Sequence, residues 1–232
     1  MGEAVKSVEG TEPKLKKCVH TLCVDNYFPE LCELTIPNHE AYAKKIGADF
    51  KLITQRNNPD WPPTYEKTQI FSKSTDYDWN IHIDADILIH PDLWDVTNTD
   101  LSTIVYYSIY DPRLYFPANP YFLRDSRLIG ICSSFIAVPI WCHDLWEPFQ
   151  IPFETAKQGL ERVHGIDDYC FTVNHAKYGH KSKFIFGNDT APPLWYIQHL
   201  EVGGDFSDSD KKEEIIKKAK SILSSWKTIE RS

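Results

Sequence analysis

The stretch Trp79-Asn80-Ile81-His82-Ile83-Asp84-Ala85-Asp86-Ile87-Leu88-Ile89-His90 decides how the rest of the chain is interpreted. Isoleucine recurs at alternate positions, which is the spacing of a buried β-strand whose side chains point to opposite faces in turn. Asp84 and Asp86 are two residues apart, so they share the other face. Two carboxylates on one face of a buried strand repel each other and are costly to bury without a cation. The stretch therefore predicts one continuous strand whose acid pair binds a divalent cation, Mn²⁺ or Mg²⁺.

Strands and helices alternate on either side of this stretch, which favours an α/β fold with a mostly parallel sheet. Residues 16–24 and 48–54 are expected to form strands around a helix at 29–46, which Pro37 should kink or split. Further helices are expected at 65–75, 143–149, 154–163, 167–178 and 208–226, and further strands at 102–109, 128–138, 183–186 and 194–199. Residues 110–127 are expected to form an ordered, aromatic surface loop. The chain has no internal repeat and no flexible linker, which predicts a disordered tail (1–15) and one domain (16–232).

Composition limits the classes of function. The formal charge of −8 argues against a sequence-independent nucleic-acid binder, which needs a basic face. No apolar run reaches the ~18 residues of a membrane span, and the N-terminus lacks the apolar core of a signal peptide. The six cysteines form no CxxC motif, so we expect reduced thiols in a cytoplasmic protein.

Polar residues follow several predicted strands, at the sheet edge where α/β proteins bind ligands. Asp25-Asn26-Tyr27 offers polar groups and a ring that suit a uracil base, although the same residues favour ordinary turns. His199 ends the last predicted strand and suits Mn²⁺, or is a surface histidine. Asp167 and Asp168 begin a predicted helix. They either cap that helix or orient or deprotonate an acceptor hydroxyl.

Taken together, these motifs resemble the GT-A fold glycosyltransferases, especially the small family of bacterial lipopolysaccharide galactosyltransferases and glycogenin. The resemblance covers roughly residues 17–204. It is carried by segments that match this family's motifs: Asp25-Asn26-Tyr27, Thr64-Tyr65-Glu66-Lys67, Ile83-Asp84-Ala85-Asp86, Cys132 to Val138, Asp167-Asp168 with Asn174, and Ile197-Gln198-His199. Ser133-Ser134 replaces the family's Asn and Gly, which leaves the donor sugar open. The family's Lys-Pro-Trp is absent after His199, and Lys211 and Lys212 come later.

The resemblance implies a single Rossmann-like GT-A domain with a nucleotide-binding half (about 16–100), an acceptor-binding half (about 101–205) and a C-terminal helix. It implies transfer of a sugar from a nucleotide-diphosphate sugar, with UDP as the expected nucleotide, to a hydroxyl of a glycan or glycoprotein. The implied nucleotide-sugar-binding residues are Thr21, Asp25, Asn26, Tyr27, Lys67, Asp84, Ala85, Ser133 and Ser134. The implied metal ligands are Asp84, Asp86 and His199, and the implied catalytic acids are Asp167 and Asp168. Arg56 is a further candidate phosphate partner.

Two other classes of function fit parts of the sequence. Phosphotransferases of the haloacid dehalogenase type also place a DxD motif after an apolar strand, but usually after the first strand of the domain. Here a complete β-α-β unit precedes Asp84. A non-catalytic carbohydrate-binding module would use the aromatic residues of 106–122 as a sugar platform, and those residues equally suit an acceptor site.

Overall fold

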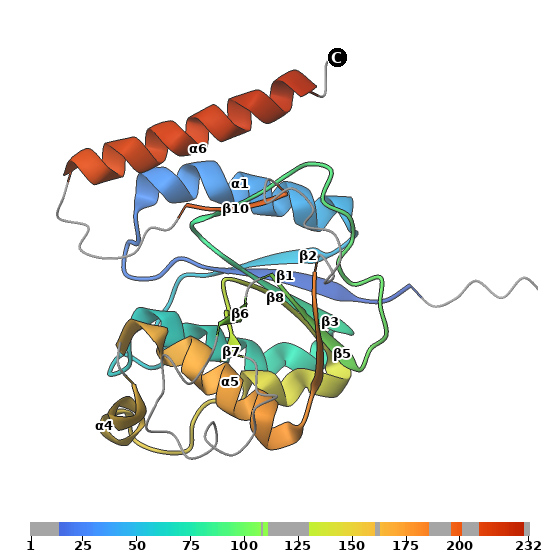
Figure 1. Cartoon of the computed structure of the whole chain (residues 1–232), viewed down its shortest axis with the longest axis vertical. Coiled ribbons are helices and arrows are strands. Elements are labelled where there is room, and N and C mark those ends of the chain that lie inside the picture. The colour runs from blue at the N-terminus through green and yellow to red at the C-terminus, as the bar shows by residue number, and fades with distance from the viewer. Residues whose placement is uncertain are drawn as a thin grey trace, which may run out of the picture.

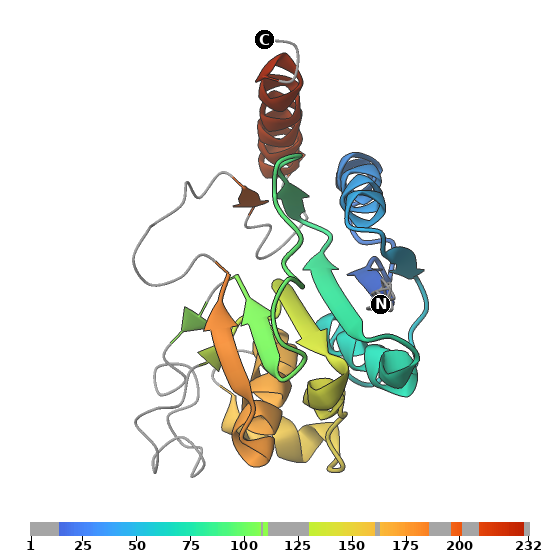
Figure 2. The same ribbon diagram turned by 90° about the vertical axis from the view of Figure 1, so that its right-hand side faces the viewer.

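A mixed six-stranded sheet runs through the centre of the molecule (Figures 1 and 2). The computed structural model describes residues 14–107, 109–110, 130–160, 163–185, 196–200 and 209–229. The strand order is β2-β1-β3-β8-β5-β9. Only β8 runs antiparallel to its neighbours in this sheet, so the predicted mostly parallel α/β sheet is confirmed. The strands are β1 (Lys17–Leu22), β2 (Asp49–Ile53), β3 (Trp79–Asp84), β5 (Thr103–Tyr106), β8 (Phe135–Pro139) and β9 (Lys181–Phe184).

Helices cover both faces of the sheet (Figure 1). Helix α1 (Pro29–Lys45) lies over one face, and η1 (Pro63–Asp76), η2 (Ile140–Trp146) and α5 (Ile166–Tyr178) lie over the other. Helix η1 has the tighter 3₁₀ geometry over its full length. Each strand therefore buries alternate side chains against different helices, which is why the central strands are buried at nearly every position.

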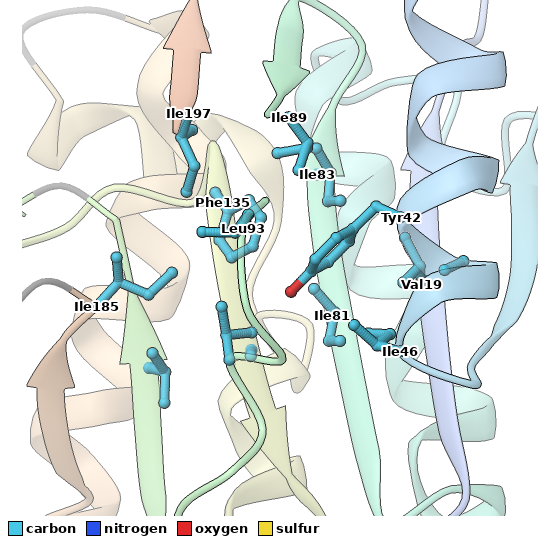
Figure 3. Packing of buried hydrophobic residues seen from close by; sticks show 14 of the residues in the cluster. Val19, Tyr42, Ile46, Ile81, Ile83, Ile89, Leu93, Phe135, Ile185 and Ile197 are labelled. Atoms are coloured by element: carbon cyan, nitrogen blue, oxygen red, sulfur yellow. The ribbon is translucent and has the colours of Figure 1, made fainter. Parts of the chain in front are cut away.

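The core on the α1 face joins helix and sheet through large apolar side chains (Figure 3). Tyr42 and Ile46, from the end of α1, pack against Ile81 and Ile83 of β3 and against Phe135 of β8. The opposite core surrounds Trp146 and Phe171, whose rings meet edge to face with centroids 5.1 Å apart. Burial on this scale stabilises the domain by roughly 25 cal/mol for each Å² of apolar surface removed from water.

The predicted C-terminal amphipathic helix is confirmed as α6 (Ser209–Ile229). It lies beside α1, on the side of α1 away from the sheet (Figure 1). Ala219 and Trp226 of α6 are buried with Leu31 of α1 and Leu88, and they form a third apolar cluster. The apolar stripe of α6 therefore covers α1 together with Leu88 and Leu200, and not the six-stranded sheet.

The prediction of one continuous strand over residues 79–90 is wrong. Strand β3 ends at Asp84, the chain turns at Ala85-Asp86, and β4 (Ile87–Ile89) begins a second, small sheet with β10 (Ile197–His199). The alternating isoleucines of both strands still enter the same core. The break follows from tertiary pairing: the Asp84 N–H donates to the Ser134 carbonyl at 2.8 Å, and the Leu200 N–H donates to the Asp86 carbonyl at 2.9 Å.

The first helix is not split at Pro37, which was one of the two outcomes predicted for it. Helix α1 continues through Pro37 as one 17-residue helix. Pro37 and Glu33 lie on the exposed side of α1, where solvent can satisfy the carbonyl that proline leaves without a donor.

The predicted helices 65–75, 143–149 and 167–178 correspond to η1, η2 and α5, but several other predicted elements are divided or shortened. The predicted strands 102–109 and 128–138 each divide, because β6 (Ile109–Tyr110) pairs with β7 (Gly130–Ile131) outside the main sheet. The predicted helix 154–163 is a run of short turns: α4 (Phe153–Ala156), η3 (Lys157–Gly159) and η4 (Val163–Gly165). Most of the predicted tail and nearly all of the predicted aromatic loop lie outside the described residues. Among the described helices, none has the length and hydrophobicity needed to cross a membrane.

Candidate active site

The predicted site residues gather at one edge of the sheet because of strand direction. Parallel strands β1 and β3 end there, at Leu22 and Asp84. Strand β8 runs the other way and therefore begins there, so Ser133-Ser134 lies at the same edge. Helix α5 starts beside it, with Asp167 and Asp168 in its first turn.

A pocket of about 780 Å³ opens at this edge, a volume typical of small-molecule sites. Its walls come from the loop after β1, the start of η1, the turn after β3 and the first turn of α6. The lining residues are Leu22, Val24, Asp25, Asn26, Tyr27, Phe28, Pro29, Glu30, Pro62, Pro63, Thr64, Lys67, Asp84, Ala85, Asp86 and Lys212. Six of the predicted nucleotide-sugar residues (Asp25 to Tyr27, Lys67, Asp84 and Ala85) line this pocket, and so do two of the three predicted metal ligands, Asp84 and Asp86.

The loop after β1 has an unusual backbone. Asp25, Asn26 and Phe28 all have positive φ, at 55°, 56° and 31°. Asp and Asn adopt this left-handed conformation at low cost, whereas an aromatic residue rarely does. The Tyr27 N–H closes the turn by donating to the Val24 carbonyl at 3.0 Å. Backbone strain of this kind is concentrated at functional sites, and here it occurs in a loop whose residues line the pocket.

Arg56 supports this loop rather than facing a ligand. Its guanidinium forms an ion pair with Asp25 and a second with Glu66, whose Oε1 lies 3.1 Å from Nε. It also donates to the carbonyls of Asn58 and Trp61. These contacts occupy the guanidinium, so the structure gives Arg56 a positioning role in place of the expected phosphate contact.

Glu66 is fully buried yet ionised. Burial by itself raises the pKa of a carboxyl, but N–H donors from Asn57, Asn58 and Gln69, together with Arg56, lower the pKa of Glu66 below its usual value. Glu66 therefore fixes the loop before η1, which forms the pocket wall around Pro62 to Thr64.

Lys67 connects two of the predicted acids. Its Nζ lies 2.7 Å from Asp84 Oδ1 and 2.8 Å from Asp167 Oδ2. Burial lowers the pKa of Lys67, but Asp167 and Asp84 outweigh it and raise the pKa well above its usual value. Burial raises the pKa of Asp84, but Lys67 and His82, whose Nε2 lies 2.8 Å from Oδ1, hold it well below its usual range. The charge of Asp84 is therefore compensated within the protein, so the burial of this acid does not by itself require a metal.

Ser133 joins this network to Asp168. Its hydroxyl accepts from Lys67 at 2.8 Å and donates to Asp167 at 2.7 Å, and its N–H donates to Asp168 Oδ1 at 2.8 Å. Burial, together with the neighbouring charge of Asp167 and against the effect of Lys67, raises the pKa of Asp168 to about 7. A carboxyl with a pKa near neutrality is suited to proton transfer.

Asp86 and His199 are the two residues that fit a metal ion. Their Oδ2 and Nε2 atoms lie 3.3 Å apart, because the pairing of β10 with β4 places His199 opposite Ile87. No cluster of three or more potential ligands is present among the described residues, since the Asp84 carboxylate faces Lys67 instead. One carboxylate and one imidazole suit Mn²⁺ or Mg²⁺ when phosphate oxygens complete the coordination.

Three residues have places that sequence reasoning did not foresee. The Thr21 hydroxyl is buried against His39 Nδ1 at 2.9 Å and does not line the pocket. The Asn174 amide donates to the carbonyls of Leu145 and Glu147, which makes it structural. Lys212 lines the pocket, and only the packing of α6 on α1 reveals this, because its sequence context is that of a solvated helix face.

Comparison with known proteins identifies the fold. No protein-family model matches the sequence, and no curated protein matches it. A glycosyltransferase involved in glycosylation of the major capsid of PBCV-1 shares 8% identity, with a TM-score of 0.52 over 88% of this chain and 98% of that one.

Two further structures have TM-scores just below 0.5. The galactosyltransferase LgtC, solved with donor and acceptor sugar analogues, has a TM-score of 0.49 at 11% identity over 90% of this chain and 95% of its own. The Drosophila β1,4-galactosyltransferase 7, solved with manganese, UDP-Gal and xylobiose, has a TM-score of 0.48 at 15% identity over 85% and 79%. The mixed sheet with helices on both faces is the GT-A fold of glycosyltransferases.

Proposed function

We propose that this protein is a metal-dependent glycosyltransferase that moves a sugar from a UDP-sugar to a hydroxyl of a glycan or glycoprotein. One observation supports this most strongly. In a GT-A fold, a single pocket combines the strained Asp25-Asn26-Tyr27 turn with the Asp84-Ala85-Asp86 turn, and His199 stands beside Asp86. Such a pocket would offer polar and aromatic groups to the base, the sugar and the diphosphate of the donor.

Residues of the two turns that line the pocket would bind the donor. Asp25 and Asn26 supply the polar groups that pair with the edge of a uracil ring, and Tyr27 supplies an aromatic face. Asp84, held by Lys67, accepts hydrogen bonds from the ribose or the donor sugar. Ser133 is buried and does not line the pocket, but its hydroxyl accepts from Lys67 at 2.8 Å and so would position Lys67 for the donor.

Asp86 and His199 would hold Mn²⁺ or Mg²⁺. When bound, the ion would act as a Lewis acid that neutralises charge on the leaving diphosphate. Lys212, in the first turn of α6, also lines the pocket, and its ammonium group would add positive charge beside the same phosphates.

Of the two acids, Asp168 is the better candidate for the base that deprotonates the acceptor hydroxyl. Asp167 is buried and its carboxylate is occupied by Lys67 and Ser133. Asp168 is half-buried, with a pKa near neutrality. In an inverting reaction through an oxocarbenium-like transition state, Asp168 takes the proton of the acceptor hydroxyl, while Asp167 positions Ser133 and Lys67.

The GT-A fold differs from the haloacid dehalogenase fold, so the fold does not support the hypothesis of a phosphotransferase. The non-catalytic carbohydrate-binding module remains as an outcome of the test.

The test is a thermal-shift panel of nucleoside diphosphates with and without Mn²⁺, followed by UDP release from UDP-sugars. The expected result is stabilisation by UDP that requires the metal, since a ligand that binds only the folded state raises its apparent stability. Slow donor hydrolysis should accompany it. Sugar binding without UDP binding or donor hydrolysis would instead identify a binding module.

A further inference from the structure

The cysteines of the loop after β1 form a close pair behind the pocket wall. Cys23 Sγ, at the end of β1, lies 2.9 Å from Cys32 Sγ, in the first turn of α1. A disulfide needs about 2.05 Å between sulfurs, so the two atoms are within about 1 Å of bonding distance. Cys23 is half-buried and Cys32 is buried.

Both thiols hold the same pocket residue. Cys32 donates to the Tyr27 carbonyl at 3.1 Å, and Cys23 donates to it at 3.7 Å. Tyr27 lies between Asn26 and Phe28, which have positive φ, and all three line the pocket. The reduced thiols therefore stabilise the strained turn through the Tyr27 carbonyl, and the residues of this turn line the pocket.

We propose that Cys23 and Cys32 form a reversible disulfide that weakens nucleotide binding, so that a peroxide switches the pocket off. Peroxide oxidises the Cys23 thiol to a sulfenic acid and one water leaves. The Cys32 sulfur then attacks the Cys23 sulfur, the S–O bond breaks, and a second water leaves with the Cys32 proton. Two thiols become one disulfide and one peroxide becomes two waters.

The order of these events follows from exposure. Cys23 is the accessible member and meets the oxidant first. Burial raises the pKa of the Cys32 thiol, so Cys32 stays protonated and reacts only after Cys23 has been oxidised. Once the disulfide forms, neither sulfur carries a hydrogen, and the Tyr27 carbonyl loses both of these donors.

The chemistry is tested by mass spectrometry on the full chain treated with hydrogen peroxide. Free thiols are blocked in acid, and the protein is then cut with chymotrypsin. Cleavage after Leu22 and Tyr27 separates Cys18, Cys23 and Cys32 from one another. The expected product is a cross-linked peptide pair holding Cys23 and Cys32, absent after dithiothreitol and absent in Cys23→Ser and Cys32→Ser.

A matched control, Cys142→Ala, removes a buried thiol outside the loop and should leave the cross-link unchanged. Free thiols after peroxide, pairing with another cysteine, or oxidation of Cys23 to a sulfinic acid would overturn the proposal. The mapping uses the unaltered protein, so the result does not depend on whether the serine variants fold.

The effect on the pocket rests on the proposed function and is measured separately. Oxidised protein should lose most of its UDP-dependent rise in melting temperature, and dithiothreitol should restore it. A mapped disulfide with an unchanged UDP response would overturn the switch. If the disulfide is mapped but the reduced protein also shows no response to UDP, disulfide formation is supported and the proposed function is contradicted.

Discussion

Lys67 Nζ lies 2.7 Å from Asp84 Oδ1, so the first acid of the Asp84-Ala85-Asp86 turn is neutralised by a lysine from a different element. The same ammonium lies 2.8 Å from Asp167. A single buried cation thus links the end of β3 to the start of α5. This link fixes the position of the turn after β3 relative to the first turn of α5.

Replacement of this lysine should destabilise the domain. In Lys67→Met, Asp84 and Asp167 lose the buried cation that they share, and we expect a loss of about 3–5 kcal/mol in the free energy of unfolding, measured by urea denaturation. Lys73→Met is the matched control, because Lys73 is exposed on the same helix and should change stability by less than about 0.5 kcal/mol. Equal stability of the two variants would contradict the central role of Lys67.

The second acid has a different expected role. Asp86→Asn should abolish the metal-dependent part of UDP stabilisation, because an amide is a much poorer ligand for Mn²⁺ than a carboxylate. The melting temperature without ligand should stay close to that of the unaltered protein. Thermal shift with UDP, with and without Mn²⁺, measures both. Asp92→Asn, at a carboxylate with 71% of its side chain exposed, should keep the full metal response.

The pattern of the sequence predicts the fold well and the site in part. Alternating isoleucines are typical of a buried strand, and Ile81, Ile83 and Ile87 do enter one core. The pattern does not show the break after Asp84, because the break depends on β4 pairing with β10, more than a hundred positions away in the chain. Local periodicity holds no information on such a partner.

The sequence also does not reveal which groups compensate the charges of Asp84 and Asp86. Two acids in an apolar strand imply a cation, but not which cation. For Asp84 it is Lys67, whose place on η1 becomes clear only once η1 packs against β3. For Asp86 the neighbouring group is His199, as the family resemblance implied. Lys212 stayed hidden for the same reason, since the packing of α6 on α1 decides where it points.

Asp168 should give the activity a pH dependence. Its pKa is raised from 3.8 to about 7 by burial and by the charge of Asp167. A general base must be deprotonated, so kcat/KM should rise with pH and level off above about pH 7. Asp168→Asn should lower kcat by about 10²-fold or more and remove this rise. An unchanged pH profile in the variant would exclude Asp168 as the base.

The same group should affect stability with a definite sign. Because the folded state binds the proton of Asp168 more tightly than the unfolded state, its contribution is full below about pH 4 and is lost as pH rises toward 7. Asp84 has the opposite shift, so its contribution is present above its unfolded pKa and is lost only in acid. Between pH 4 and 7, Asp168→Asn should therefore flatten the decline in unfolding free energy, measured by denaturation at a series of pH values.

Arg56 should act on donor binding through the turn that it holds. Arg56→Lys keeps a positive charge but cannot reach Asp25, Glu66 and the loop carbonyls at once. We expect KM for the donor to rise by about tenfold, the equivalent of one charge-assisted hydrogen bond, with kcat nearly unchanged. Steady-state kinetics separates the two constants. A fall in kcat with constant KM would instead place Arg56 at the reacting atoms.

Lys212 should contact phosphates rather than the base. It lines the pocket from the first turn of α6, and its Nζ lies 5.8 Å from the centre of the Phe28 ring. Lys212→Ala should weaken UDP binding by about tenfold and leave uridine binding unchanged, because only UDP carries the charges that a lysine attracts. Calorimetry at two salt concentrations should show a smaller salt dependence in the variant. Lys218→Ala, on an exposed position of the same helix, is the control and should match the unaltered protein. Equal weakening for UDP and uridine would mean that the substitution disturbs the Phe28 turn instead of removing a phosphate contact.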